Sequence, residues 1–249
     1  MRMRRQLLVL AVVTCALLLG ASSVRAQGQA AGNPWAIDFG VGISPSIKGD
    51  INSGVIGTFQ GQTVAVVPHT YGDVYGNSID WHFGGGYTLS ADSEIHGAFI
   101  YQSTAANLVR LGDFGPSSLY GQFSDYKSWA LDVGYRRYVP VSGARVYAEG
   151  TIGIADIHRI NVVFAAPQSN LITENGDFYD GTAAFTWSVA GGVLFPIAQQ
   201  VDLSAQIGLR HVGGLANVDQ FVGTSLAAIN NDSARLSFPI IVGVRFRLR

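Results

Sequence analysis

The fold is decided by residues 236–248, LSFPIIVGVRFRL. Side chains of a β-strand alternate between its two faces, so every second residue lies on the same side. One face of this stretch is wholly apolar and consists of Leu236, Phe238, Ile240, Val242, Val244, Phe246 and Leu248. The opposite face carries Ser237, Gly243, Arg245 and Arg247. Such a strand belongs where one side meets lipid or an apolar core and the other meets a polar space.

The beginning of the chain has the pattern of an export signal. Three arginines among the first five residues precede an apolar run at 7–19, and Val24, Arg25 and Ala26 then resemble a cleavage site. We predict that residues 1–26 are a removed signal peptide and that residues 27–33 form a short lead. The only cysteine, Cys15, lies inside this signal, which leaves no disulfide framework and no cysteine-based site in the mature chain.

Charge and hydropathy narrow the class of protein. The chain has 16 basic and 17 acidic side chains, and the predicted signal removes four arginines, so the mature net charge is −5 (16 − 4 − 17). No basic surface is available for nucleic acid, which we exclude as a partner. Only 13% of residues are charged and 31 are glycine, yet no apolar run after the signal is long enough for a spanning helix. Transmembrane β-barrels have this combination.

The alternation of residues 236–248 recurs along the chain. We predict eight strands, at 35–43, 79–89, 94–102, 128–136, 145–155, 185–195, 201–210 and 236–248. Long connections at 44–78, 103–125, 156–181 and 213–234 alternate with short turns, and the apolar patch Val64–Val67 suggests a hairpin that extends beyond the membrane. Short periplasmic turns and long external loops are typical of outer-membrane barrels. Residues 34–249 are therefore predicted to form an eight-stranded antiparallel up-and-down transmembrane β-barrel.

The apolar faces support a lipid environment. None of their positions in the eight predicted strands holds Asp, Glu, Lys or Arg. Aromatic residues gather at the strand ends and predict two interfacial girdles: Trp81, Tyr101, Trp129 and Trp187 near the long loops, and Trp35, Tyr87, Tyr135, Phe195 and Phe246 near the short turns. A soluble lipocalin-like barrel is the alternative, but it would need the charged faces outside and gives no reason for the alternating loop lengths.

With these features the chain resembles the small eight-stranded outer-membrane β-barrel proteins, the group of the OmpA transmembrane domain, OmpX and OmpW. The resemblance covers residues 34–248 as a pattern. It implies a location in the bacterial outer membrane, contact with outer-membrane lipid and insertion by the barrel assembly machinery. Its one local motif is the closing strand, where Gly243, Phe246 and Leu248 match the spacing of the assembly signal. The family commonly ends on the aromatic residue, whereas this chain continues to Arg249.

The polar strand faces predict a charged lumen. Because buried charges must be paired, we expect carboxylates and guanidiniums to form a network there. Asp38 is expected to reach Arg245 across the seam between the first and last strands. The predicted network comprises Asp38, Glu94, Asp132, Arg136, Glu149, Asp202, Arg210, Arg245 and Arg247, of which Glu94, Arg136, Glu149, Asp202, Arg245 and Arg247 are expected near the periplasmic end. Such a lumen would leave no room for a wide pore.

Histidines on the lumenal faces do not predict a metal or catalytic site. His82 is expected about six residues further from the hairpin turn than His96, which is roughly 20 Å. They could then not share an ion, and Asp80 is expected to orient His82. No serine is placed beside a histidine in the pattern of a deacylase. We therefore expect no catalytic residue, no cofactor and no metal site.

The external loops carry the remaining functional information. They are predicted to be acidic, and residues 173–180, TENGDFYD, are interpreted as a solvated turn rather than a cation site. We expect a monomeric outer-membrane protein with a structural and surface-interaction role, whose acidic loops meet a surface ligand or partner. A narrow OmpW-like channel for small solutes is the alternative, and a lipid- or peptide-processing enzyme comes third.

Overall fold

The computed structural model describes residues 33–173, 175–218, 221–230 and 234–248. The predicted signal peptide, nearly all of the short lead and Arg249 lie outside the described residues and stay predictions. In the described ranges, no helix is long and apolar enough to cross a membrane.

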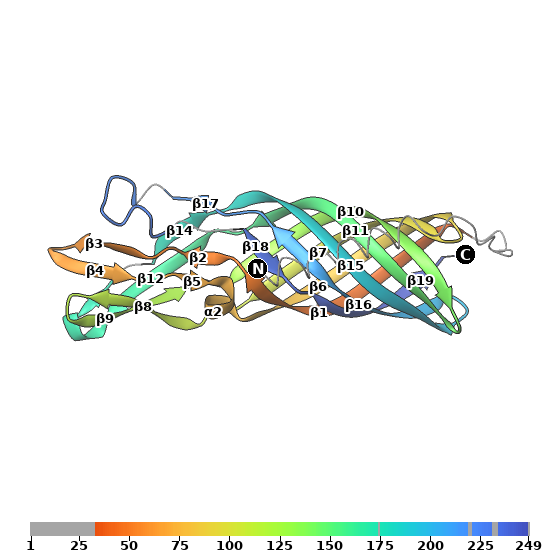
Figure 1. Ribbon diagram of the computed structural model, residues 1–249, viewed down its shortest axis with the longest axis horizontal. Coiled ribbons are helices and arrows are strands. Elements are labelled where there is room, and N and C mark those ends of the chain that lie inside the picture. The colour runs from red at the N-terminus through yellow and green to blue at the C-terminus, as the bar shows by residue number, and fades with distance from the viewer. Residues whose placement is uncertain (1–32, 174, 219–220, 231–233, 249) are drawn as a thin grey trace, which may run out of the picture.

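Eight long antiparallel strands form a closed barrel (Figure 1). Each strand pairs with the next, and the first pairs with the last from Ala36 opposite Arg247 to Ile43 opposite Ile240. The predicted fold class is confirmed, and seven of the eight strands are longer than the sequence pattern indicated, whereas the last one is shorter. They are β1 (Trp35–Lys48), β6 (Asn77–Ser90), β7 (Ser93–Thr104), β10 (Tyr126–Val141), β11 (Ala144–Ile157), β15 (Thr182–Ala198), β16 (Val201–Val212) and β19 (Ile240–Arg247).

The last predicted strand is interrupted at Pro239. Residues 235–237 form a separate short strand, β18 (Arg235–Ser237), which lies between β1 and β16. Proline has no backbone N–H to give to a neighbouring strand. Its carbonyl still accepts a hydrogen bond from the Gly208 backbone N–H at 3.1 Å. The wall therefore stays paired on both sides of the break.

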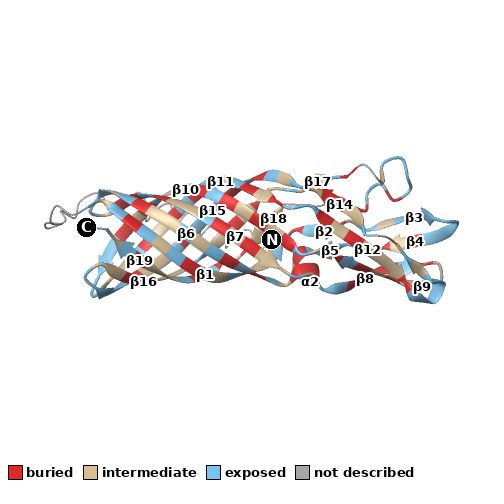
Figure 2. Cartoon of the chain, turned by 180° about the vertical axis from the view of Figure 1, so that it is seen from behind, coloured by how far each residue is buried: buried red, intermediate tan, exposed pale blue. Residues whose placement is uncertain are grey.

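Burial alternates along the barrel strands, as Figure 2 shows. Large apolar side chains such as Leu131 and Val242 are more than half exposed on the outer face. The aromatic residues predicted for the girdles occupy this face at both ends of the barrel. Trp81 and Trp129 both lie opposite Tyr101 on neighbouring strands, and at the other end the rings of Trp35 and Tyr87 have centroids 4.9 Å apart.

A second sheet continues from the long connections, beyond the long-loop end of the barrel. Its order is β17-β14-β12-β9-β8-β4-β3, with β13 paired to β12. The hairpin expected near Val64 is confirmed as β3–β4. The connections at 103–125 and 156–181 form strands where we predicted loops, whereas the described part of 213–234 contains only the two-residue strand β17. The strands are β3 (Val55–Phe59), β4 (Gln62–Val66), β8 (Leu108–Phe114), β9 (Ser117–Phe123), β12 (Ile160–Ala166), β13 (Leu171–Ile172), β14 (Gly176–Asp180) and β17 (Ala216–Asn217).

Smaller elements join this extension to the barrel. The strands β2 (Asp50–Asn52) and β5 (His69–Thr70) pair with each other and lead into the short helix α2 (Tyr71–Tyr75). Thr70 and Asp73 form a capping box at the start of α2, and the Thr70 backbone N–H holds the pKa of Asp73 below its usual value. A turn of 3-10 helix, η1 (Pro167–Ser169), follows β12.

An apolar core fills the extension and continues into the adjoining end of the barrel, which explains why these segments fold. Ile51, Leu111, Ile160, Phe178 and Tyr179 are all buried in one cluster. The interpretation of residues 173–180 as a solvated turn is wrong, because Gly176–Asp180 is a strand of the extension. Burial of Phe178 and Tyr179 supplies the free energy that fixes this strand.

The acidic side chains of that strand are paired with a single arginine. The two guanidinium nitrogens of Arg159 lie 2.7 Å from Asp177 and 3.1 Å from Asp180. Arg110 and Asp113 form a similar exposed pair at 2.7 Å. Several acidic side chains of the described external surface are therefore neutralised by arginines, so this surface carries less unpaired negative charge than the number of acidic residues suggests.

The outer face predicts how the barrel responds to charge. We expect Val242→Arg to destabilise the protein in vesicles by roughly 2–4 kcal/mol, the cost of an arginine on the lipid face near the midplane. The measurement is urea unfolding in phosphatidylcholine vesicles. Ile56→Arg is the matched control, because Ile56 is 77% exposed on the extension and should tolerate the charge. Equal stability of the two variants would contradict the assigned lipid face.

Candidate functional site: the charged lumen

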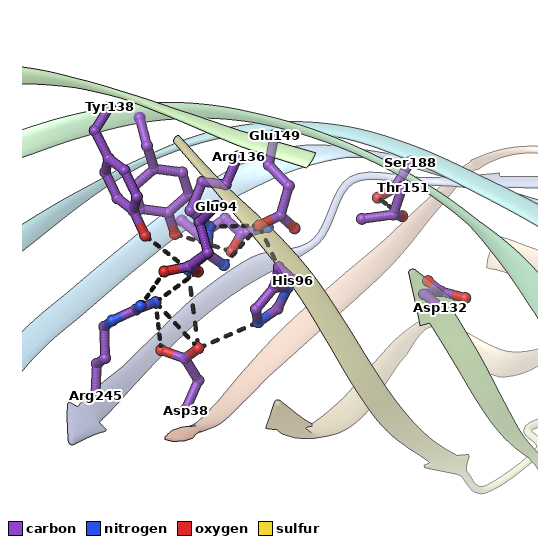
Figure 3. A network of polar contacts seen from close by, with 12 residues as sticks. Asp38, Glu94, His96, Asp132, Arg136, Tyr138, Glu149, Thr151, Ser188 and Arg245 are labelled. Atoms are coloured by element: carbon purple, nitrogen blue, oxygen red, sulfur yellow. Dashed lines mark hydrogen bonds and ion pairs between the residues drawn. The ribbon is translucent and has the colours of Figure 1, made fainter. Parts of the chain in front are cut away.

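Charged side chains from five barrel strands meet in the lumen towards the end with the short turns (Figure 3). The strands are β1, β7, β10, β11 and β19, and each contributes through lumen-facing residues. We call this group the lumenal cluster. It consists of Asp38, Glu94, His96, Arg136, Glu149 and Arg245, with Tyr138 and Tyr147 packed beside them.

Arg245 joins the last strand to the first. It lies directly opposite Asp38 in the strand register, and its Nη1 is 3.3 Å from Asp38 Oδ2. The same nitrogen is 3.0 Å from Glu94 Oε1, and Nη2 bonds to Glu94 Oε2. Arg245 and Glu94 are both almost fully buried. The seam of the barrel therefore carries an ion pair on its inner face, with Glu94 as a second acceptor.

Arg136 occupies the middle of the opposite wall. In the strand register it lies opposite Glu94 on one side and Glu149 on the other. Its Nη2 is 2.6 Å from Glu149 Oε2, and its Nη1 is 3.5 Å from Glu94 Oε1. The guanidinium also lies over the ring of Tyr147, 4.4 Å from the centroid. Glu94 is thus shared by two arginines.

His96 belongs to the cluster, although the predicted network did not include it. Its Nε2 is 3.2 Å from Asp38 and its Nδ1 is 3.5 Å from Glu149. The cluster contains three carboxylates and two guanidiniums, and His96 lies between two of these carboxylates. The sequence did contain a signal for His96, because its position in the alternating pattern places it on the lumen-facing side of the strand, where a buried polar residue needs a partner.

Two glycines on β6 make room for these contacts. The β6 strand lies between β7, which carries His96 and Glu94, and β1. A Cβ at Gly84 would lie 2.7 Å from His96 Nε2, and one at Gly86 would collide with the Glu94 carboxylate. Because these positions have no side chain, His96 and Glu94 lean across β6 and reach Asp38 and Arg245.

The remaining predicted residues form two separate groups. Asp132 pairs with Arg210 and accepts a hydrogen bond from Thr186 at 2.8 Å. Asp202 lies 3.2 Å from both Arg145 and Arg247. The predicted network is therefore divided into separate groups, since Asp202 pairs with Arg145 and Arg247 and no ion pair of the described residues joins it to the lumenal cluster.

A further polar group lies in the lumen near the extension. The Arg235 guanidinium donates to Gln102 and to Ser78, each at 2.7 Å, and lies 4.9 Å from the ring centroid of Tyr126. Tyr126 also packs edge-to-face on Tyr71 of α2. Sequence reasoning missed this group because Arg235 lies at the boundary between the fourth long connection and the last predicted strand.

Helix α2 is anchored over this group by Tyr75. The Tyr75 hydroxyl donates to the Ser124 carbonyl at 3.2 Å, and burial raises the pKa of Tyr75. The phenol therefore remains a neutral donor over the physiological pH range. The helix and the Arg235 group together occupy the barrel mouth beneath the extension.

Asp80 and His82 do not interact as expected. The Asp80 carboxylate accepts hydrogen bonds from Ser44 and from Gln102, and His82 Nε2 has no hydrogen-bond partner among the described residues. The prediction that Asp80 orients His82 is wrong. The distance estimate for the two histidines also changes, because Gly86 lies opposite His96 and only four residues separate it from His82, roughly 13 Å.

No metal-binding group of three or more His, Cys, Asp or Glu side chains is present in the described part of the chain. The histidine best placed for chemistry, His96, is held between two carboxylates. The arrangement can fix strands to one another and fill the lumen with paired charge.

The closed antiparallel ring, the apolar outer face and the charged interior define the class: the protein is a small outer-membrane β-barrel. No protein-family model and no curated protein sequence matches it. The structure is similar to Neisserial surface protein A (NspA), with a TM-score of 0.48 and 12% identity over 86% of this chain and 96% of that chain. OprG, an outer membrane protein of Pseudomonas aeruginosa, has a TM-score of 0.45 and 9% identity over 88% of this chain and 97% of that chain. Ail, the attachment invasion locus protein of Yersinia pestis, has a TM-score of 0.38 and 9% identity over 85% of this chain and 98% of that chain.

The lumenal cluster predicts strong coupling between Arg245 and Glu94. We expect Arg245→Gln alone to cost about 3–5 kcal/mol, because it leaves a buried carboxylate without its main partner. Adding Glu94→Gln should recover part of that loss, with a coupling energy of about 0.5–3 kcal/mol in a double-mutant cycle. Equilibrium unfolding in vesicles measures all variants.

The control for this cycle is the exposed pair Arg110 and Asp113. Its substitution to glutamine and asparagine should change stability by less than about 1 kcal/mol. A coupling energy near zero for Arg245 and Glu94 would show that the lumenal cluster does not act as a unit.

Proposed function

We propose that this outer-membrane barrel is sealed and non-enzymatic, and that it holds a rigid β-sheet extension outside the cell for contact with a surface partner. The observation that carries the proposal is the paired charge across the lumen. Side chains from five strands of the wall meet there, so the barrel acts as a support and not as a conduit.

The space left in the lumen supports a sealed state. The two cavities beside His82 and His96 have volumes of about 40 Å³ each. Such volumes suit one or a few ordered waters, which polar walls can hold. A solute would have to displace Arg136 or Arg245 from carboxylates that are themselves buried. Separating such pairs is costly, which favours a closed barrel.

The extension supports a role in contact. Its strands are formed by the long connections of the barrel and are stabilised by an apolar core that reaches into the adjoining end of the barrel. A surface that only needed to be solvated would not require such a core. Its outer side presents both exposed ion pairs and highly exposed apolar residues, among them Ile56 and Ile172. Interfaces with partners commonly combine these features.

Conductance in planar bilayers tests the sealed state. We expect the native protein to give no sustained conductance, because the lumenal cluster closes the barrel. The double variant Arg245→Ala/Glu94→Ala removes both members of a buried pair and should produce brief small openings. A steady conductance from the native protein would instead support the narrow channel for small solutes.

The matched control removes an ion pair of the same kind elsewhere. Arg110→Ala/Asp113→Ala removes an exposed pair on the extension, and this variant should give no conductance in the bilayer. If this variant conducted as much as the lumenal one, the openings would not come from loss of the lumenal cluster. Folding of each variant is checked by a heat-modifiable shift in gel mobility.

A further inference from the structure

The extension contains an apolar cavity of about 190 Å³. It lies between the β3–β4 and β8–β9 hairpins, β12 and residues 221–229, in the part of the molecule furthest from the short turns (Figure 1). Ten of its twelve lining residues are apolar, and none is charged: Phe59, Val64, Phe114, Leu119, Val162, Phe164, Leu171, Phe221, Leu226 and Ile229, with Thr173 and Gly176.

The cavity is partly open to solvent, and its wall is almost wholly apolar. A dry apolar cavity of about 150 Å³ in another protein is already large enough to bind benzene. Binding of water in this cavity is unfavourable, because a bound water needs two to four polar partners and the wall is apolar.

The wall has a buried end and an accessible end. Val162, Leu119 and Ile229 are at most 3% exposed, whereas Phe59 is 40% exposed and Phe221 is partly exposed. An apolar molecule could therefore enter past the two phenylalanines and lose its contact with water at the buried end. Burial of its surface would supply the free energy of binding.

Residues 221–229 form one side of the cavity and are tied to the sheet edge. The Ser225 hydroxyl accepts a hydrogen bond from the Thr58 backbone N–H at 2.8 Å, and the Ser53 backbone N–H donates to the Ile229 carbonyl at 3.3 Å. These contacts hold the segment across the free edge of β3. They keep the cavity from closing by collapse of that side.

We infer that this cavity is a binding site for a small apolar molecule, such as a single aromatic ring or a short alkyl chain, taken up from the external medium. Four phenylalanines offer ring faces and edges to an aromatic ligand. The hydroxyl of Thr173 already accepts from the Phe164 backbone N–H at 2.9 Å and could donate one hydrogen bond to a polar substituent. A charged ligand would find no counter-charge in the lining. This site is separate from the sealed lumen and does not depend on the proposed role of the barrel.

Toluene is the probe for this site, used on the full protein in amphipol without free detergent. The readout is the methyl NMR spectrum of isoleucine, leucine and valine. We expect saturable shifts at Leu119, Leu226 and Ile229, whose methyl groups line the cavity, and no saturation at Val242 on the lipid face.

Leu171→Trp should fill the cavity and abolish the saturable shifts. Leu108→Trp is the matched control, since Leu108 is 63% exposed on the same extension but does not line the cavity. If Leu171→Trp fails the heat-modifiability check, Thr173→Asp replaces it and should weaken binding by placing a charge in the wall. Non-saturable shifts in the native protein, or saturable binding that survives the cavity substitutions, would overturn the inference.

Discussion

The barrel depends on the requirement that every backbone N–H and C=O in the hydrocarbon layer be paired within the protein. A sheet with open edges cannot meet it, so the first strand must pair with the last. That pairing places Asp38 opposite Arg245 with both side chains facing inward. Two charges on the inner face of neighbouring strands then require partners, and Glu94, Arg136, Glu149 and His96 supply them. Closure of the backbone and pairing of the lumenal charges are therefore two consequences of one register.

The strands of the barrel could be predicted because the membrane imposes a strict alternation on them. A charge on the lipid face is costly, so the period of two is not interrupted over the central part of each strand. The extension lacks this constraint, and its alternation is broken. In β8 the register shifts next to Gly112, so that Leu111 and Gly112 are both buried. In β14, Phe178 and Tyr179 are consecutive and buried, beside a register shift in β12. Bulges of this kind conceal a strand from a period-two search. The length of the four connections was the better signal, because long structureless loops are uncommon in compact proteins.

The sequence predicted most of the residues that belong to the candidate site, but not all of the contacts between them. The alternation of side chains along each strand places Asp38, Arg136 and Arg245 on the lumenal faces, and the strand register then gives direct neighbours such as Arg136 and Glu149. Contacts that cross an intervening strand do not follow from this alternation. Glu94 reaches Arg245 over β6 because Gly86 has no side chain there. The role of a lumenal glycine is defined by the long side chain that lies over it.

The two interiors of the molecule follow from their different surroundings. Inside the barrel, a polar lumen is enclosed by a wall whose outer face must be apolar, so the strands have one face left for charge and fill it with paired groups. The extension stands in water, its outer face carries both ion pairs and exposed apolar residues, and its inner face is apolar. Residues 221–229 lie along its free edge without filling the space beneath. The two sheets thus enclose different interiors, since the barrel sheet surrounds paired charges and the extension sheet borders an apolar cavity.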